Sequence, residues 1–237
     1  MVKIVIIILN IWQGFVNKCK LKNMHLGGMG KGVHFAFPST ISNPSQVYLY
    51  DYSRLQSRHT IYNYTGKFVL KEYSGVSVDL LVVTGNHKPT VGIPQYLLAP
   101  SHINDIEKDV IVEEDVWIGA RVTLLAGSHI GRGAVVGANT LVNKEIPPYA
   151  VVVGSPAKII AAKFTIDQIM EHERILYPEK KRFTKEYLEE LFNQYYTGKK
   201  TIGISCDLGK TNLEQFKKQF HSNTCHNIQQ TNICCPN

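Results

Sequence analysis

The side chains best suited to chemistry are two histidines and an aspartate in one irregular segment of this 237-residue chain. His87 lies in the stretch GNHKP, and His102 and Asp105 lie in the stretch SHIND. A neutral imidazole can accept a hydroxyl proton near neutral pH, and a carboxylate in the same loop can orient the ring. On the residues alone, a loop histidine that bonds to the backbone is the simpler explanation of His87, so its role stays open at this point.

The elements that must position this segment repeat every six residues. Apolar residues lead the repeats at Val112, Ile118, Leu124, Ile130, Val136 and Val142. Four positions after each lead comes a second small or apolar residue: Val116, Val122, Ser128, Ala134, Thr140 and Ile146. A six-residue period fits neither a helical stripe nor a lone alternating strand, and it predicts the stacked coils of a parallel β-helix. Glycine follows the lead residue at Gly119, Gly131 and Gly137, where we expect it to adopt the turn conformation.

A weaker version of the rhythm precedes these repeats. Residues 41–84 are predicted to form earlier, degenerate coils, with apolar leads that include Leu70, Val76 and Val82. Between Thr84 and Val110 the pattern breaks, and three prolines and two glycines argue against a regular helix or central strand there. The apolar content of this long loop argues against disorder, so we expect an arm that reaches a neighbouring subunit.

Composition and charge restrict the function classes. The net charge of +7 comes without long basic runs or an aromatic-plus-basic motif, which favours an anionic ligand over nucleic acid. The apolar start, MVKIVIIILNIW, is too short to span a bilayer. It is either a signal peptide or a buried edge strand or capping segment, and no stable membrane insertion is expected. Five cysteines without zinc spacing indicate incidental thiols in a reducing, cytoplasmic compartment, with no bound metal.

Four segments are expected along the chain. Residues 1–40 are predicted to be an irregular N-terminal segment, and 41–160 a β-helix domain with its loop at 85–109. Residues 161–196 are predicted to form C-terminal helices, and 197–237 a weakly ordered tail. A Thr-x-x-Gln capping box at Thr165–Gln168 opens the first helix, and the second runs from about Thr184 to Tyr196.

The segment VWIGARVTLLAGSHIGRGAVVGANTLVNKEIPPYAVVVGSPAKII resembles the hexapeptide-repeat acyltransferases. It is most similar to the galactoside, maltose and capsular-polysaccharide O-acetyltransferases, over residues 82–163. The resemblance implies a mainly β fold: a left-handed parallel β-helix with an extended loop and C-terminal helices. It also implies a homotrimer with active sites between subunits, acetyl-CoA as donor, and a sugar or glycan hydroxyl as acceptor.

The same resemblance assigns site residues. His87 takes the place of the family's catalytic general base, with Asn86, His102, Asp105 and Trp117 near the acceptor. His102 is the rival base, and Trp117 either lines the cleft or packs outside the coil. The family's contacts to CoA fall here on Ala120, Ala138, Asn143, Lys144, Lys158 and Lys163. Asn139 and Asn143 depart from the glycine and threonine that are usual in the family at these positions.

Other functions remain open on the sequence. An antibiotic or an amino sugar would keep the acetyl-transfer chemistry and change the acceptor. A non-catalytic solenoid scaffold is the structural alternative. A γ-type zinc carbonic anhydrase would need three converging histidines, and no two histidines share a repeat-commensurate spacing within the clean coils.

Overall fold

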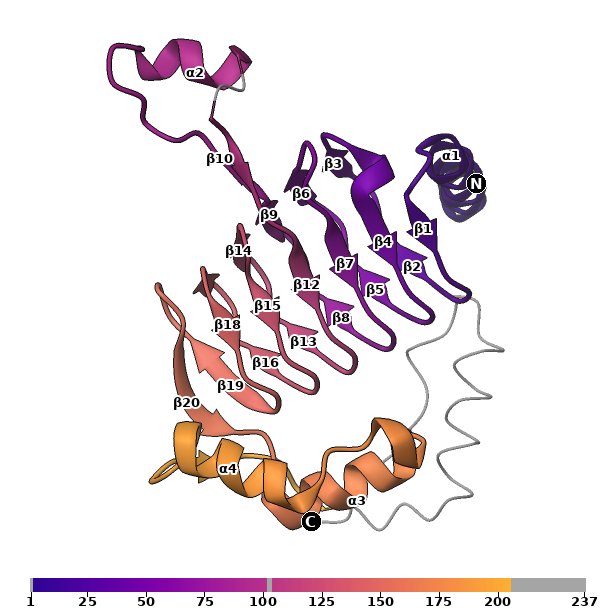
Figure 1. Cartoon of the computed structure of the whole chain (residues 1–237). Helices are drawn as coiled ribbons and strands as arrows, with labels where there is room; N and C mark the ends of the chain where they lie inside the picture. The colour runs from indigo at the N-terminus through magenta and orange to yellow at the C-terminus, as the bar shows by residue number, and fades with distance from the viewer. Residues whose placement is uncertain (1, 102–103, 206–237) are drawn as a thin grey trace.

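The chain forms a parallel β-helix in which each complete coil contributes one short strand to each of three sheets (Figure 1). The structure, a computed structural model, describes residues 2–101 and 104–205, with the backbone alone for 2–11 and Ala99. The three sheets are called sheets A, B and C below. The chain runs from A through B to C in five coils, and the last coil contributes only β18 and β19, to sheets A and B. Neighbouring strands of successive coils pair in parallel and in register.

Sheet A contains β1 (Gly28–Met29), β4 (Val47–Leu49), β7 (Phe68–Leu70), β12 (Val110–Val112), β15 (His129–Ile130) and β18 (Glu145–Ile146). Sheet B contains β2 (His34–Phe35), β5 (Arg54–Leu55), β8 (Gly75–Val76), β13 (Trp117–Ile118), β16 (Val135–Val136), β19 (Ala150–Val153), β20 (Lys158–Ala162) and β21 (Lys200–Thr201). Sheet C contains β3 (Ser39–Ile41), β6 (His59–Tyr62), β9 (Leu81–Val83), β14 (Thr123–Leu125) and β17 (Leu141–Val142).

The core is the column of lead residues that the six-residue period predicts. All six of them, from Val112 to Val142, are fully buried, and so are the second-position residues from Val116 to Ile146. Burying aliphatic side chains of this size contributes about 1.5–3 kcal/mol each. The predicted earlier coils also form, with Leu70, Val76 and Val82 buried in the same column.

The glycines after the lead residues serve a purpose other than the one expected. Gly119, Gly131 and Gly137 do not have the left-handed backbone of a turn. A Cβ on Gly119 would lie 2.6 Å from the backbone nitrogen of Ala138, and one on Gly131 would lie 2.5 Å from that of Pro148. Close stacking of one coil on the next therefore requires glycine at these positions.

The long loop of residues 85–109 projects from the corner between sheets C and A as an arm (Figure 1). Its base is a two-stranded antiparallel ribbon of β10 (Gly85–Asn86) and β11 (Ile106–Glu107), and its tip carries the short helix α2 (Gln95–Ser101). The expectation of no regular helix here was wrong. Pro94 precedes the helix and Pro100 lies in its last turn, so seven residues fit between constraints that would break a longer helix.

The N-terminal segment is also more regular than predicted. Residues 1–40 were expected to be irregular, but they contain helix α1 (Val2–Asn23) and the strands of a first coil, which starts at Gly28 rather than at residue 41. The isoleucine-rich run favours a strand by β propensity, whereas the structure forms a helix there. None of the helices in the described part of the chain has the length and apolarity needed to cross a bilayer.

The C-terminal helices cover the last coils. Helix α3 (Ile166–Leu176) begins at the capping box of Thr165 and Gln168, and α4 (Lys185–Tyr195) has Thr184 as its N-cap. A short 3-10 turn, η2 (Glu179–Lys181), joins them, and another, η1 (Pro44–Gln46), precedes β4. The expected weak order from residue 197 does not hold at Lys200–Thr201, which pair with β20; the tail from 206 lies outside the described residues.

A buried polar cluster holds α3 against the β-helix. Glu173 of α3 is 1% exposed and accepts hydrogen bonds from the hydroxyl of Tyr149 at 2.7 Å and the guanidinium of Arg132 at 3.0 Å. Burial, followed by the carboxylate of Glu173, raises the pKa of Tyr149 well above its ordinary value, so its hydroxyl stays protonated and donates.

Candidate functional site

The carboxylate of Glu107 attaches the base of the arm to the neighbouring coil of the β-helix. Glu107 on β11 accepts hydrogen bonds from the backbone N–H of Gly66 at 3.0 Å and from the hydroxyl of Thr84. Gly85 lies opposite Glu107 in the ribbon, and a Cβ on it would lie 2.1 Å from the Glu107 carboxylate. Glycine at 85 therefore allows this close approach.

The ribbon brings His87 to Asp105. Its register pairs Asn86 with Ile106, and one residue further along His87 comes opposite Asp105. The Nδ1 atom of His87 lies 2.8 Å from Oδ1 of Asp105. The Asp105 side chain is 14% exposed, whereas the His87 side chain is 40% exposed. In the neutral ring, a carboxylate at Nδ1 favours the tautomer with the proton on that nitrogen, and Nε2 then has the lone pair that a general base requires.

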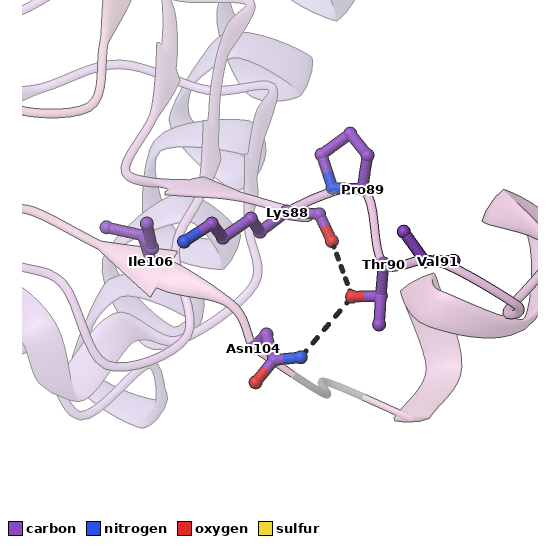
Figure 2. A pocket seen from close by; sticks show the side chains of 6 residues that line it. All are labelled: Lys88, Pro89, Thr90, Val91, Asn104 and Ile106. Carbon is purple, nitrogen blue, oxygen red and sulfur yellow. Dashed lines mark hydrogen bonds between the residues drawn. The ribbon is translucent and has the colours of Figure 1, made fainter.

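An open depression of about 450 Å³ adjoins this pair on the arm. Figure 2 shows its lining residues, which are Lys88, Pro89, Thr90, Val91, Asn104 and Ile106. The Asn104 amide donates to the Thr90 hydroxyl at 3.3 Å, and that hydroxyl donates to the carbonyl of Lys88 at 3.1 Å. These bonds connect the two sides of the arm beside His87. The depression combines apolar side chains with one ammonium group, so it can receive a molecule of mixed polarity.

Three of the predicted donor contacts lie together at the corner between sheets B and C. Ala120 and Ala138 follow β13 and β16 in successive coils, and the N–H of Asn139 donates to the carbonyl of Ala120 at 2.9 Å. Lys158, at the start of β20, pairs with Val153 in the next coil and is exposed. The small residues Ala120 and Ala138 thus form a column that ends at the exposed ammonium group of Lys158.

Two further predicted contacts lie at a different corner. Asn143 and Lys144 connect β17 of sheet C to β18 of sheet A, and both are exposed. This is the corner from which the arm projects, since residues 84–109 make the same C-to-A connection in an earlier coil. The structure therefore places Asn143 and Lys144 on the edge that carries His87, across sheet C from Ala120 and Ala138.

Lys163 is not placed with either group. Its ammonium lies 2.8 Å from Oδ2 of Asp115, and the same oxygen lies 3.1 Å from Nε2 of His172. Although burial opposes it, the bonds from His172 and Lys163 hold the pKa of Asp115 below its ordinary value. Lys163 is thus part of the contact between α3 and the β-helix, at a third place on the molecule.

Trp117 and His102 complete the predicted set. Trp117 faces outward from sheet B, is 51% exposed and covers Gly75, where a Cβ would lie 3.1 Å from the indole. This agrees with an aromatic side chain outside the coil, away from the corner of His87. His102 lies outside the described residues. Within residues 2–101 and 104–205, no group of three or more His, Cys, Asp or Glu residues gathers as metal ligands.

Sequence reasoning did not identify Glu107, Lys88 or Asn104. Glu107 follows Asp105 at strand spacing, and this alternation just before the repeats resume is the one signal that pointed to paired carboxylates at the arm's base. Lys88 and Asn104 come together only through the ribbon register, which no local pattern reveals.

The fold and the His–Asp pair define the class: a parallel β-helix with a histidine-bearing arm inserted at one corner. Residues 109–144 match the family described as "Bacterial transferase hexapeptide (six repeats)". The chain is 44% identical over 61 residues to a chloramphenicol acetyltransferase of Klebsiella aerogenes, an alignment that covers 26% of this chain and 29% of that one. This chain therefore spans less than a third of the length of that relative.

Solved structures share the architecture. A hexapeptide-repeat-containing acetyltransferase of Vibrio cholerae, complexed with acetyl coenzyme A, superposes with a TM-score of 0.55 at 20% identity, covering 63% of this chain and 78% of that one. A galactoside acetyltransferase in complex with coenzyme A superposes with a TM-score of 0.51 at 18% identity, covering 68% and 75%. The predicted resemblance is confirmed: this chain carries the hexapeptide repeat of the bacterial transferases and the fold of hexapeptide-repeat acetyltransferases.

Proposed function

We propose that this protein is an acetyl-CoA-dependent O-acetyltransferase that acetylates a sugar or glycan hydroxyl. The observation that carries the proposal is the pair of His87 and Asp105, joined at 2.8 Å at the base of the arm. The acetyltransferase relative and the hexapeptide-repeat match support the same reaction class. In this proposal the β-helix is left-handed, the assembly is a homotrimer, and the enzyme works in the cytoplasm.

His87 is the general base. Its Nε2 atom takes the proton of the acceptor hydroxyl as the oxygen forms its bond to the acetyl carbon, and Asp105 stabilises the positive charge that the ring then carries. The carbon–sulfur bond of the thioester breaks, and the proton on Nε2 passes to the thiolate that leaves. Acid–base help of this kind contributes about 10²–10⁴ in rate. Asp105 is a positioning residue, because it acts through the ring of His87. Asn86 lies beside the base, and His102 remains a proposed acceptor contact. Trp117 faces outward from sheet B, away from this corner, and is left out of the site.

Acetyl-CoA, when bound, supplies the acetyl group as an activated thioester. The residues present suit it: Ala120 and Ala138 leave room beside the backbone, and the exposed Lys144 and Lys158 suit phosphate groups as point charges. The two sets of residues lie at different corners of one prism. We infer that the corner of Ala120 in one protomer faces the arm corner of another, which supports a site between subunits. Lys163 is left out of this site because it pairs with Asp115.

An antibiotic acceptor is the second candidate function. The relative from Klebsiella aerogenes is a chloramphenicol acetyltransferase, and the depression on the arm has Pro89, Val91 and Ile106 among its lining residues. An acceptor with an apolar body and a hydroxyl would suit such a lining. An amino-sugar acceptor would change the product from an ester to an amide. A non-catalytic scaffold or a zinc carbonic anhydrase would transfer no acetyl group.

An acceptor panel tests the proposal. Thiol release from acetyl-CoA would be measured with sugars, oligosaccharides, amino sugars and chloramphenicol, with CoA binding measured by calorimetry and the zinc content by elemental analysis. The proposal expects CoA binding and turnover with a sugar hydroxyl. Turnover only with chloramphenicol would select the second candidate. CoA binding without turnover of any acceptor, or no CoA binding at all, would contradict an acetyltransferase, and stoichiometric zinc would favour the anhydrase.

A further inference from the structure

Helix α1 (Val2–Asn23) projects from the first coil of the β-helix, at the end remote from α3 and α4 (Figure 1). Four consecutive residues, Trp12 to Phe15, are all exposed, and nothing lies within 4 Å of a Cβ built on Gly14. Four consecutive helical residues point in directions that together go most of the way around the axis. The β-helix therefore covers no side of α1 at this level.

Two aromatic side chains of α1 are exposed next to each other. Trp12 is 64% exposed and Phe15 60%, and their rings lie 6.1 Å apart. The sequence of the helix before them, VKIVIIILNI, is almost entirely aliphatic. Two adjacent exposed aromatic rings on one helix favour a partner that covers them. The observation to explain is what covers this helix.

The polar residues of α1 follow a pattern that suits a surface rather than a core. Before Lys18 they recur at positions 3, 10, 13 and 17, a spacing that lies along one side of a helix. Lys18, Lys20 and Lys22 follow at its C-terminal end and are spread around the axis. The Gln13 amide donates to the Asn17 side chain at 2.9 Å, so these two polar groups lie on the same side. A helix of 22 residues is about 33 Å long, and one with a narrow polar stripe and a wide apolar face can lie in the plane of a bilayer surface.

Charge decides between the possible occupants. The first fifty residues contain five lysines and no arginine, aspartate or glutamate; the first acidic residue is Asp51. Lys18, Lys20 and Lys22 are all exposed at the end of α1 that joins the β-helix. A second copy of α1 would bring like charges together, whereas anionic lipid headgroups complement them.

We propose that α1 attaches this protein to an anionic lipid surface. The apolar face enters the boundary between headgroups and acyl chains, Trp12 lies at that boundary, and the three lysines contact the headgroups. This is peripheral attachment without a membrane span, and it goes beyond the sequence expectation that excluded only stable insertion. It does not rest on the acetyltransferase proposal, because α1 contributes no residue to the site at the arm.

Vesicle co-sedimentation of the full chain tests the proposal, with phosphatidylcholine vesicles that contain or lack phosphatidylglycerol. We expect binding to the anionic vesicles that weakens in high salt. Trp12→Ser with Phe15→Ser should lower the partition coefficient more than about tenfold. Lys18, Lys20 and Lys22 changed together to Gln should lower it about a hundredfold, from roughly fivefold for each lysine.

Matched controls carry the same changes at the other end of the molecule. Lys180, Lys185 and Lys199 changed together to Gln remove the same charge from exposed positions, and Ile204→Ser removes an apolar side chain that is 77% exposed. Both should bind like the wild type. In a Trp117→Phe background Trp12 is the only tryptophan, and its emission should shift to the blue only with anionic vesicles.

Three results would overturn the proposal. The first is no binding to vesicles. The second is vesicle binding by the α1 variants that equals the binding of the control variants. The third is equal binding to vesicles with and without anionic lipid. If the ring variant instead dissociates an oligomer in light scattering while vesicles do not bind, a second copy covers α1. Retained helical circular dichroism in each variant separates loss of the surface from loss of the fold.

Discussion

The contact between His87 and Asp105 gives the sharpest prediction. Asp105→Asn keeps the size of the side chain and removes the charge that faces Nδ1 of His87 across 2.8 Å. A hydrogen bond to a charged group contributes about 1.5–3 kcal/mol, which corresponds to roughly ten- to hundredfold in rate. Because the His87 side chain is 40% exposed and therefore screened, we expect the lower end of that range.

The expected loss falls on kcat, since Asp105 acts on the base and not on the donor. The assay is the initial rate of thiol release with the acceptor that the panel selects, at several concentrations of each substrate. Asp109→Asn is the matched control: its carboxylate accepts from the N–H of Lys67 at 2.8 Å at the base of the same arm. That variant should keep the wild-type kcat.

A double variant distinguishes positioning from a general loss of structure. If Asp105 acts only through His87, then Asp105→Asn should cost nothing further in a His87→Ala background. An unchanged kcat in Asp105→Asn, or additive losses in the double variant, would contradict a positioning role for Asp105. An equal loss in Asp109→Asn would show that any disturbance of the arm lowers the rate.

Three further predictions concern stability. His59 is 1% exposed, and burial lowers its pKa below the ordinary 6.5; the neutral ring is therefore favoured in the fold, and the free energy of unfolding should fall as the pH is lowered below 6.5. Denaturant titrations should show a weaker acid dependence in His59→Leu and no change in the exposed control His25→Gln. Leu124→Ala removes a fully buried lead residue and should destabilise by about 2–5 kcal/mol in the same titrations, and a loss below 1 kcal/mol would contradict the packed column. Glu173→Gln removes the buried one of the two carboxylates that pair with the guanidinium of Arg132, the other being Glu114. It should lower the thermal midpoint and expose the last coils to proteolysis, and unchanged digestion would argue against the role of this buried polar cluster.

The interior of the β-helix could be predicted because every coil requires an apolar side chain at the same position. A lead side chain such as Ile118 or Val136 has to be apolar and to recur every six residues, and this is visible in a single sequence. The first coil escaped notice because its interior positions are less regular: Val33, Phe35 and Ile41 are only partly buried.

The site was less accessible to sequence reasoning because it depends on contacts between distant residues. Asp105 was named as an orienting group only because it shares the loop of His87, and the ribbon register is what brings the two together. Lys163 shows the opposite case: its position in the motif suggested a phosphate contact, but the fold presents Asp115 to it. A basic residue near the end of a repeat has several possible partners, and the tertiary packing determines which of them it contacts.

The most direct test of the account is the rate of acetyl transfer by His87→Ala, measured together with its affinity for CoA. The account predicts that kcat falls by about 10²–10⁴ while CoA binds as it does to the wild type. Transfer at the wild-type rate by this variant would contradict the assignment of the base.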